Sequence, residues 1–195
     1  TKVGAFSISV TAKTSGGKTS AFVVENCVLV KGMDIYVSSE SGSDENFGND
    51  PEKPKKTIIS ALRSLAVGGI LHLADGVYPQ ESTLVISQAM TIKGNDANPE
   101  AVVIRRSNST SYTVMNLKAS CVLRGIVVEN GYVNNSGGIG AGIDITASSI
   151  VTNCIIRNNR IYSNNYNGAG GIRNAAAGSV IVDCVITNNA SNAYQ

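Results

Sequence analysis

The sequence predicts an all-β fold: a parallel β-helix, or β-solenoid, with an N-terminal capping helix and a leading β-hairpin. Three observations lead to this prediction. After residue 130 the chain consists mainly of Asn, Gly, Ser, Ala, Val and Ile, and only five residues there are charged. Short apolar runs recur about every 30 residues, as from Cys154 to Cys184. A unit of that length cannot bury an apolar face alone, but a stack of such units can.

Composition excludes several classes of function. The 195 residues carry 16 basic and 14 acidic side chains, a net charge of +2, which gives no reason to expect nucleic acid or an anionic membrane as a partner. No apolar run approaches the length of a membrane span. The four cysteines include no CxxC pair, and His72 is the single histidine. We therefore expect no metal, no cofactor and no disulfide framework.

Residues 1–31 predict a β-hairpin. Phe6–Val10 and Ala21–Val24 are apolar or alternating runs on either side of a Gly-Gly turn within Thr14–Lys18. Because an isolated hairpin is marginal in water, it needs a partner surface. Two arrangements are open: the hairpin is the last part of a preceding sandwich domain, or it lies across the β-helix.

Residues 32–83 predict the N-terminal cap of the β-helix. A strand at Asp34–Ser38 is followed by a loop rich in turn-forming residues. Thr57 then suits a helix N-cap, and the helix is expected over Thr57–Ala66, ending before Gly68 and Gly69. Its apolar residues recur at helical spacing: Ile58, Ile59, Leu62, Leu65 and Ala66. A helix here would cover the core that an open solenoid end exposes.

Residues 84–195 predict the coils, each with three short strands. Alignment of the repeats predicts columns of stacked, inward-facing side chains, and Cys154 and Cys184 stack as buried free thiols rather than a disulfide. Because no capping segment follows the last coil, we expect the β-helix to continue in a longer protein. The predicted columns are Cys121–Ile150–Val180, Leu123–Thr152–Val182, Gly125–Cys154–Cys184 and Val127–Ile156–Ile186.

Polar residues also recur at the coil period. Asn130, Asn159 and Asn189 are expected to form a hydrogen-bonded column at a corner. Asp144 and Arg173 are expected to form a surface ion pair. Glu129 aligns with Asn158 and Asn188, which leaves it without an acidic neighbour.

The segment from Tyr36 to Tyr78 resembles the N-terminal segment of right-handed parallel β-helix proteins of the pectate-lyase-like superfamily. The resemblance rests on Gly42-Ser-Asp44, Pro51-Glu-Lys-Pro54, Lys56-Thr-Ile58 and Leu73-Ala-Asp-Gly-Val-Tyr78. The later repeats, such as Gly168–Asn174, are similar to those of secreted bacterial β-helix proteins, including outer-membrane adhesins. The resemblance implies a right-handed, extracytoplasmic β-helix, and it leaves activity open because this superfamily includes lyases, hydrolases, epimerases and adhesins.

The sequence offers no catalytic constellation. A polysaccharide lyase needs Ca²⁺ held by several carboxylates and a Lys or Arg base, and a glycoside hydrolase needs clustered carboxylates. After Gly131 the coils carry two Asp and no Lys. Four acidic residues in the loop after Asp34–Ser38 could hold a cation, but in the resembling family this loop is structural: Asp44, Glu45, Asp50 and Glu52.

Tyrosine-containing loops are the predicted ligand-binding feature. They recur at one coil position, and tyrosine rings beside amides suit sugars. The alternative is that these rings cover the flank of the solenoid. The candidate residues are Tyr132, Tyr162, Asn164, Asn165, Tyr166 and Tyr194.

We therefore expect an extracytoplasmic bacterial β-helix segment that is not catalytic as it stands and contacts a polysaccharide or cell-surface glycan. One alternative is the N-terminal part of a polysaccharide lyase or glycoside hydrolase with catalytic coils beyond residue 195. Another is the structural stalk of an adhesin. We also expect an end-to-end homodimer through the last coil, whose strand edges lack a partner.

Overall fold

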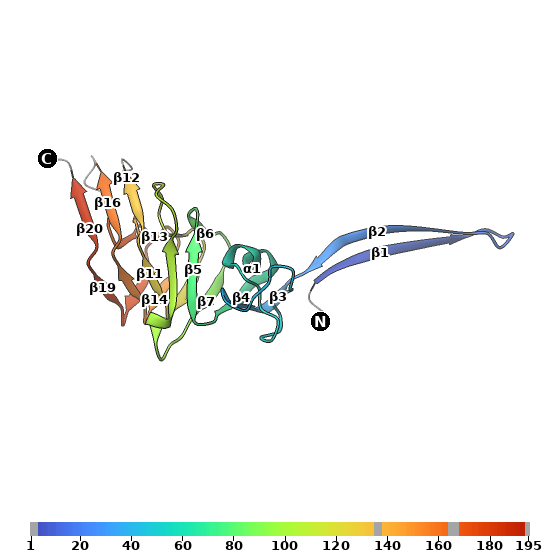
Figure 1. Ribbon diagram of the computed structural model, residues 1–195. Helices are drawn as coiled ribbons and strands as arrows, with labels where there is room; N and C mark the ends of the chain where they lie inside the picture. The colour runs from blue at the N-terminus through green and yellow to red at the C-terminus, as the bar shows by residue number, and fades with distance from the viewer. Residues whose placement is uncertain (1–3, 135–137, 164–167, 194–195) are drawn as a thin grey trace.

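The computed structural model describes residues 4–134, 138–163 and 168–193. It is a parallel β-solenoid with a helix at its N-terminal end, and a long hairpin extends from that same end (Figure 1). The predicted fold class is confirmed. Among the described residues, the structure shows no helix of the length and apolarity that crossing a bilayer requires.

The hairpin pairs β1 (Gly4–Lys13) with β2 (Thr19–Val30) in antiparallel register. Both strands are longer than the sequence predicted. The ribbon extends away from the coils rather than across them (Figure 1). Its apolar side chains alternate along each strand, so that Val10 faces Phe22 and Ile8 faces Val24 on one exposed surface.

The cap consists of β3 (Gly32–Val37), α1 (Ile58–Ser64) and β4 (Leu65–Leu73). The predicted N-cap is confirmed, since the Thr57 hydroxyl accepts a hydrogen bond of 3.2 Å from the Ser60 N–H. The helix ends two residues earlier than predicted. Leu65 is extended, fully buried and paired with Gly32 of β3, and this strand pairing outweighs the helical pattern of the local sequence.

The coils stack their strands into four parallel sheets. Sheet B contains β3, β4, β7 (Met90–Lys93), β10 (Cys121–Arg124), β14 (Ile150–Thr152) and β18 (Val180–Val182). Sheet C contains β5 (Gly76–Gln80), β8 (Val102–Arg106), β11 (Val127–Glu129), β15 (Ile155–Arg157) and β19 (Val185–Thr187). Sheet D contains β6 (Leu84–Ile86), β9 (Met115–Leu117), β13 (Ile143–Ile145) and β17 (Ile172–Asn174). Sheet E contains β12 (Tyr132–Asn134), β16 (Arg160–Ser163) and β20 (Ala190–Ala193), and a short 3-10 helix, η1, covers Pro99–Ala101.

Sheet E corrects the prediction of three strands in every coil. The coils that begin with β4 and β7 contribute one strand each to sheets B, C and D. From β10 onward, a fourth strand follows the strand of sheet C. These segments were expected to be loops, but each pairs in register with its equivalent one coil away, and that pairing satisfies their backbone groups.

The predicted columns are right for the last two coils and wrong for the coil before them. Ile150 pairs with Val180, Thr152 with Val182, and Ile156 with Ile186, as expected. One coil earlier, however, Val122 pairs with Ile150 and Val127 with Ile155. The spacing there is 28 residues, from Val122 to Ile150, rather than 29. The alignment of the repeats therefore placed three residues of this coil one position away from their observed columns: Cys121, Leu123 and Val127.

The inward face of sheet B also differs from the prediction. Val151 is fully buried, whereas Ile150 is 42% exposed and points outward. A shift of one residue moves every side chain of a strand to the other face of the sheet. The wrong pairing of β10 with β14 and the wrong assignment of Ile150 to the core therefore have the same origin.

Left-handed residues form the corners before and after sheet C. Asn130, Asn158 and Asn188 have φ values of 63°, 57° and 50°. At the other corner, Gly125, Asn153 and Asp183 have φ values of 67°, 50° and 54°. Only Gly, Asn and Asp adopt this conformation readily, which explains why the coils are rich in these residues.

The asparagine column is confirmed in part. Asn159 is 1% exposed, and its amide donates to the Asn189 side-chain oxygen (2.9 Å) and to the Val128 carbonyl (3.2 Å). Its own side-chain oxygen accepts from the Gly131 N–H at 2.8 Å. Gly131, rather than Asn130, therefore occupies this column in the coil of β10.

The cysteines of the coils are free thiols. A hydrogen bond to Cys184, together with burial, raises the pKa of Cys154, and the same bond lowers the pKa of Cys184 to about 6. Burial raises the pKa of Cys121 to about 12. The stacking of Cys154 and Cys184 on neighbouring coils agrees with the prediction.

Candidate functional site

Sheet E presents an aromatic and cationic surface to solvent. Tyr132 pairs with Arg160, and Asn134 pairs with Tyr162. The residues between them, Val133 and Ile161, are buried in a small apolar cluster. Side chains alternate between the two faces of a strand, so the burial of Val133 and Ile161 means that the side chains on either side of them face outward. These outward-facing residues are Tyr132, Asn134, Arg160 and Tyr162.

The two tyrosine rings meet on this outer surface. The Tyr132 and Tyr162 ring centroids are 6.0 Å apart with an interplanar angle of 64°, an edge-to-face arrangement. The Arg160 guanidinium lies 5.3 Å from the Tyr162 ring centroid and donates a 2.9 Å hydrogen bond to the Tyr162 hydroxyl. Both rings remain partly exposed.

A second arginine extends this cluster toward the preceding coil. The Arg106 guanidinium lies 5.4 Å from the Tyr132 ring centroid and 5.9 Å from that of Tyr112. It is held by its Nε donating to the Asn130 carbonyl at 2.8 Å and one Nη donating to the Thr110 carbonyl at 2.9 Å. We call Arg106, Tyr112, Tyr132, Arg160 and Tyr162 the tyrosine–arginine cluster.

Tyr112 is anchored by its backbone and by its hydroxyl. Its N–H donates to the Tyr132 carbonyl at 2.7 Å, and its hydroxyl donates to the Gln80 carbonyl at 2.6 Å. Arg106 and Tyr112 were not among the predicted site residues. They precede the coils that contain sheet E, so no repeat in the sequence relates them to Tyr132.

The predicted site residues are only partly placed by the structure. Tyr132 and Tyr162 come together, on strands rather than on loops. Asn164, Asn165, Tyr166 and Tyr194 lie outside the described residues.

Two buried carboxylates of the coils, those of Asp144 and Glu129, are engaged in ion pairs. Asp144 pairs with Arg173 as predicted, with Nε and Oδ1 2.6 Å apart, but Asp144 is 2% exposed, so the pair is not a surface pair. Glu129 aligns with Arg105 and Arg157 rather than with Asn158, and it accepts a 2.8 Å hydrogen bond from the Arg157 Nε. These ion pairs raise the pKa of both Arg173 and Arg157.

The acidic loop of the cap is organised by its own lysine. The Lys55 ammonium is buried and donates to the Asn46 carbonyl at 2.6 Å and to the Asp44 carbonyl at 3.1 Å. The Asp44 carboxylate accepts from the Lys56 N–H (3.0 Å), the Thr57 N–H (2.9 Å) and the Thr57 hydroxyl (2.8 Å). Over the described residues, no three His, Cys, Asp or Glu side chains gather as metal ligands would.

The tyrosine–arginine cluster therefore offers a ligand aromatic rings for stacking and hydroxyl and guanidinium groups for hydrogen bonding. Its charged groups are guanidinium ions, which stay protonated at any physiological pH. Partly exposed aromatic rings with donor groups beside them suit the apolar faces and hydroxyl groups of a sugar.

Comparison with known proteins adds no relative to this description. No protein-family model matches the chain, and no curated protein shows detectable sequence similarity to it.

Proposed function

We propose that this chain is an extracytoplasmic β-helix segment, related to bacterial proteins of the pectate-lyase-like superfamily, that binds carbohydrate through the outer surface of sheet E. The observation that supports this proposal best is the edge-to-face pair of Tyr132 and Tyr162 on that surface. Relationship and location rest on the resemblance of the cap and repeat motifs. The glycan site rests on the geometry of the tyrosine–arginine cluster.

The segment acts, in this proposal, by binding alone. Asp144 and Glu129 are buried and hold arginines of adjacent strands, which suits a structural role. A carboxylate that serves as a general acid or base must reach the proton that it transfers. Neither of these carboxylates offers an exposed face to a sugar.

The competing function is a structural stalk, and one observation favours it. The Tyr132 ring packs against Arg106 of the preceding coil and against the Tyr162 ring of the following coil, and these contacts would tie neighbouring coils together even without a ligand. The two functions predict different effects when a tyrosine ring is removed by substitution. A binding ring contributes to glycan affinity, whereas a stalk ring contributes to stability alone.

The decisive experiment is a glycan array probed with the wild-type chain, Tyr132→Ala and a control, Tyr36→Ala. Tyr36 is matched because it is also partly exposed, on sheet B, and its ring stacks on His72 at 4.7 Å. We expect Tyr132→Ala to weaken glycan binding at least about tenfold, as loss of one stacking contact would, and Tyr36→Ala to leave binding unchanged. Absence of glycan binding, or equal effects of the two variants, would favour the stalk.

The proposal also includes end-to-end pairing of two copies through the last coil. Two apolar side chains of the last coil, Ile181 and Ile186, are 38% and 51% exposed, although they stack on the buried Val151 and Ile156 of the preceding coil. Pairing of two such ends would bury these side chains and satisfy the backbone groups of the strands beside them. An isologous contact of this kind closes as a dimer.

A further inference from the structure

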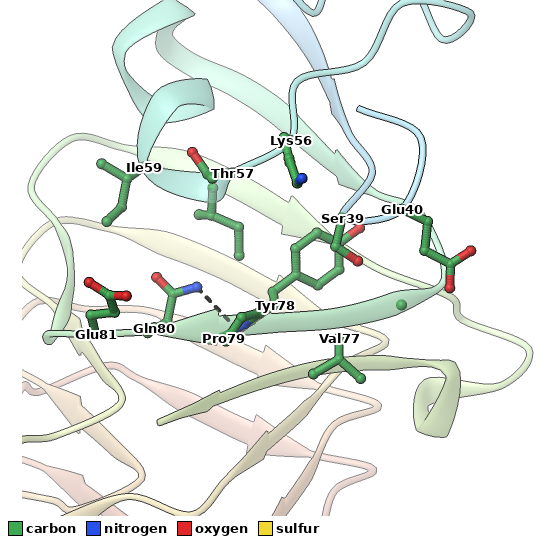
Figure 2. Close-up of a pocket in the computed structure, with 12 residues that line it drawn as sticks. Ser39, Glu40, Lys56, Thr57, Ile59, Val77, Tyr78, Pro79, Gln80 and Glu81 are labelled. Carbon is green, nitrogen blue, oxygen red and sulfur yellow. Dashed lines mark hydrogen bonds between the residues drawn. The ribbon is translucent and has the colours of Figure 1, made fainter. Parts of the chain in front are cut away.

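A cavity of about 720 Å³ lies at the N-terminal end of the solenoid, between α1 and β5 (Figure 2). One side is formed by Lys56, Thr57, Ile58 and Ile59, where the helix begins, and Ser39 and Glu40 close one end. The other side is formed by the six consecutive residues 76–81. We call this cavity the cap groove. It is far from sheet E in the sequence, and the sequence analysis did not anticipate it.

The cap groove runs along the edge of β5, not over one of its faces. Side chains of a strand alternate between the two faces, so a cavity that touches every residue from Gly76 to Glu81 must follow the edge. Within the part of the chain that the structure describes, β5 is also the terminal strand of sheet C, with β8 as its single neighbour. In sheet B, by contrast, the order continues past β4 to β3.

Backbone acceptors of β5 point toward this open edge. The Gln80 carbonyl accepts from the Ser107 N–H at 2.8 Å, on the β8 side. Since successive carbonyls of a strand point to opposite edges, those of Val77 and Pro79 point away from β8. Pro79 lacks a backbone N–H, so it is tolerated in a strand only where no neighbouring strand needs a hydrogen bond from that N–H. The open edge of β5 is such a place.

The walls of the cap groove are apolar and its ends are acidic. Tyr78 and Ile58 are buried in its floor, at 2% and 1% exposure, while Val77 and Ile59 are 39% and 46% exposed. Glu40 and Glu81 stand near opposite ends, and Lys56 is the one cation among the lining residues (Figure 2). The lining residues carry a net charge of −1, which favours a ligand with a basic residue.

We propose that the cap groove binds an extended polypeptide segment of a partner protein, which adds as a strand to the open edge of β5. The segment donates backbone N–H groups to the carbonyls of Val77 and Pro79, places apolar side chains against Ile59 and Val77, and directs a Lys or Arg toward Glu81 or Glu40. Strand addition of this kind draws affinity from the main chain and specificity from the pockets beside it. The site is distinct from the proposed glycan surface, although the two meet where the Tyr112 hydroxyl donates to the carbonyl of Gln80, a lining residue of the cap groove.

The test is a selection of random heptapeptides, displayed on phage, on the immobilised 195-residue chain. Enriched peptides are synthesised, and their affinities are measured by fluorescence anisotropy for the wild type, Ile59→Asp and a control, Ile150→Asp. Ile59 and Ile150 are exposed to similar extents, 46% and 42%, but Ile150 lies on sheet B outside the groove. An acidic residue in the first turn of α1 also agrees with the helix dipole, so Ile59→Asp should fold.

We expect Ile59→Asp to weaken binding at least about tenfold and Ile150→Asp to change it less than about twofold. Methylation of alternate backbone nitrogens of the peptide should weaken binding to a similar extent, because it removes the donors. Glu81→Lys provides a second arm and should weaken binding of peptides that carry a basic residue. The proposal is overturned if no peptide is enriched, if Ile59→Asp binds as the wild type does, or if N-methylated peptides bind as well as unmodified ones.

Discussion

At the scale of single residues, the Asn159 side chain connects its own coil to the preceding and the following coil by hydrogen bonds. It connects Gly131, Val128 and Asn189 through donors and an acceptor that are almost completely shielded from water. An aspartate in its place would keep the acceptor, lose both donated hydrogen bonds and set one oxygen against the Asn189 oxygen.

We therefore expect Asn159→Asp to lower the free energy of unfolding by about 2 kcal/mol at neutral pH. Chemical denaturation followed by circular dichroism measures this change. The control is Asn134→Asp, which makes the same chemical change at an exposed position of β12. Equal stabilities of the two variants would mean that the asparagine column contributes nothing beyond shape.

Asp44 carries a pH dependence that can be predicted at the same scale. Burial raises the pKa of its carboxyl, but the hydrogen bonds from Thr57 and Lys56 outweigh this effect and lower the pKa below its ordinary value of 3.8. A carboxyl whose folded pKa is lowered contributes stability above its unfolded pKa and loses that contribution as the pH falls through the folded pKa.

The stability difference between wild type and Asp44→Ala should therefore be constant near neutral pH and shrink as the pH falls below about 3.8. Urea denaturation over a pH series tests this expectation. A difference that stays constant into strong acid would show that the carboxylate charge does not contribute.

At the scale of elements, α1 packs on the first coils through a narrow face that contains Ile58 and Ala61. The other apolar residues that the sequence predicted for the core side of the helix are less buried or belong to β4. Ile58 and Ala61 are 1% and 0% exposed, whereas Leu62 is only partly buried and Ile59 faces the cap groove. The helix is short because Leu65 already belongs to β4. With fewer than two full turns, only one narrow face of the helix reaches the core.

Ile58→Ala should therefore cost about 2–5 kcal/mol of stability, and Leu62→Ala about 1 kcal/mol. Thermal or urea unfolding of the two variants, with far-ultraviolet circular dichroism to confirm the fold, checks the order. The reverse order would place the core side of the helix at Leu62.

At the scale of the whole molecule, burial is lost along the solenoid axis. Val151 and Ile156 are fully buried in the coil of β14, whereas Ile181 and Ile186, which stack on them in the last coil, are 38% and 51% exposed. Each coil of a solenoid contacts only its neighbours, so stability should decrease toward that end. Amides that depend on fewer buried contacts open more easily.

Amides of β18 and β19 should accordingly exchange with solvent faster than those of β10 and β11 at low protein concentration. Raising the concentration should protect them if two ends pair, and light scattering should show a dimer. Ile186→Lys should abolish the protection, and Ile150→Lys, at a similarly exposed site in the preceding coil, should not. Rapid exchange at every concentration would exclude end-to-end pairing.

Most of the fold could be predicted because its determinants are local and repeated. Asn, Gly and Asp mark the left-handed corners, β-branched residues mark the strands, and Thr57 marks the start of α1. Each coil reuses the same chemistry, so the period of about 30 residues was visible in the sequence. Two of the five residues of the tyrosine–arginine cluster were predictable for the same reason, since Tyr132 and Tyr162 recur at related positions.

The sequence by itself thus determined the solenoid, its period and the helix start. The tertiary structure alone decided the one-residue shift between Val122 and Ile150, the strands of sheet E, the early end of α1, the approach of Arg106 and Tyr112 to Tyr132, and the cap groove. The physical reason is common to these features. Each depends on pairing or packing between segments that do not repeat one another, so no local pattern encodes the contact, and the exact length of each coil decides which side chains meet.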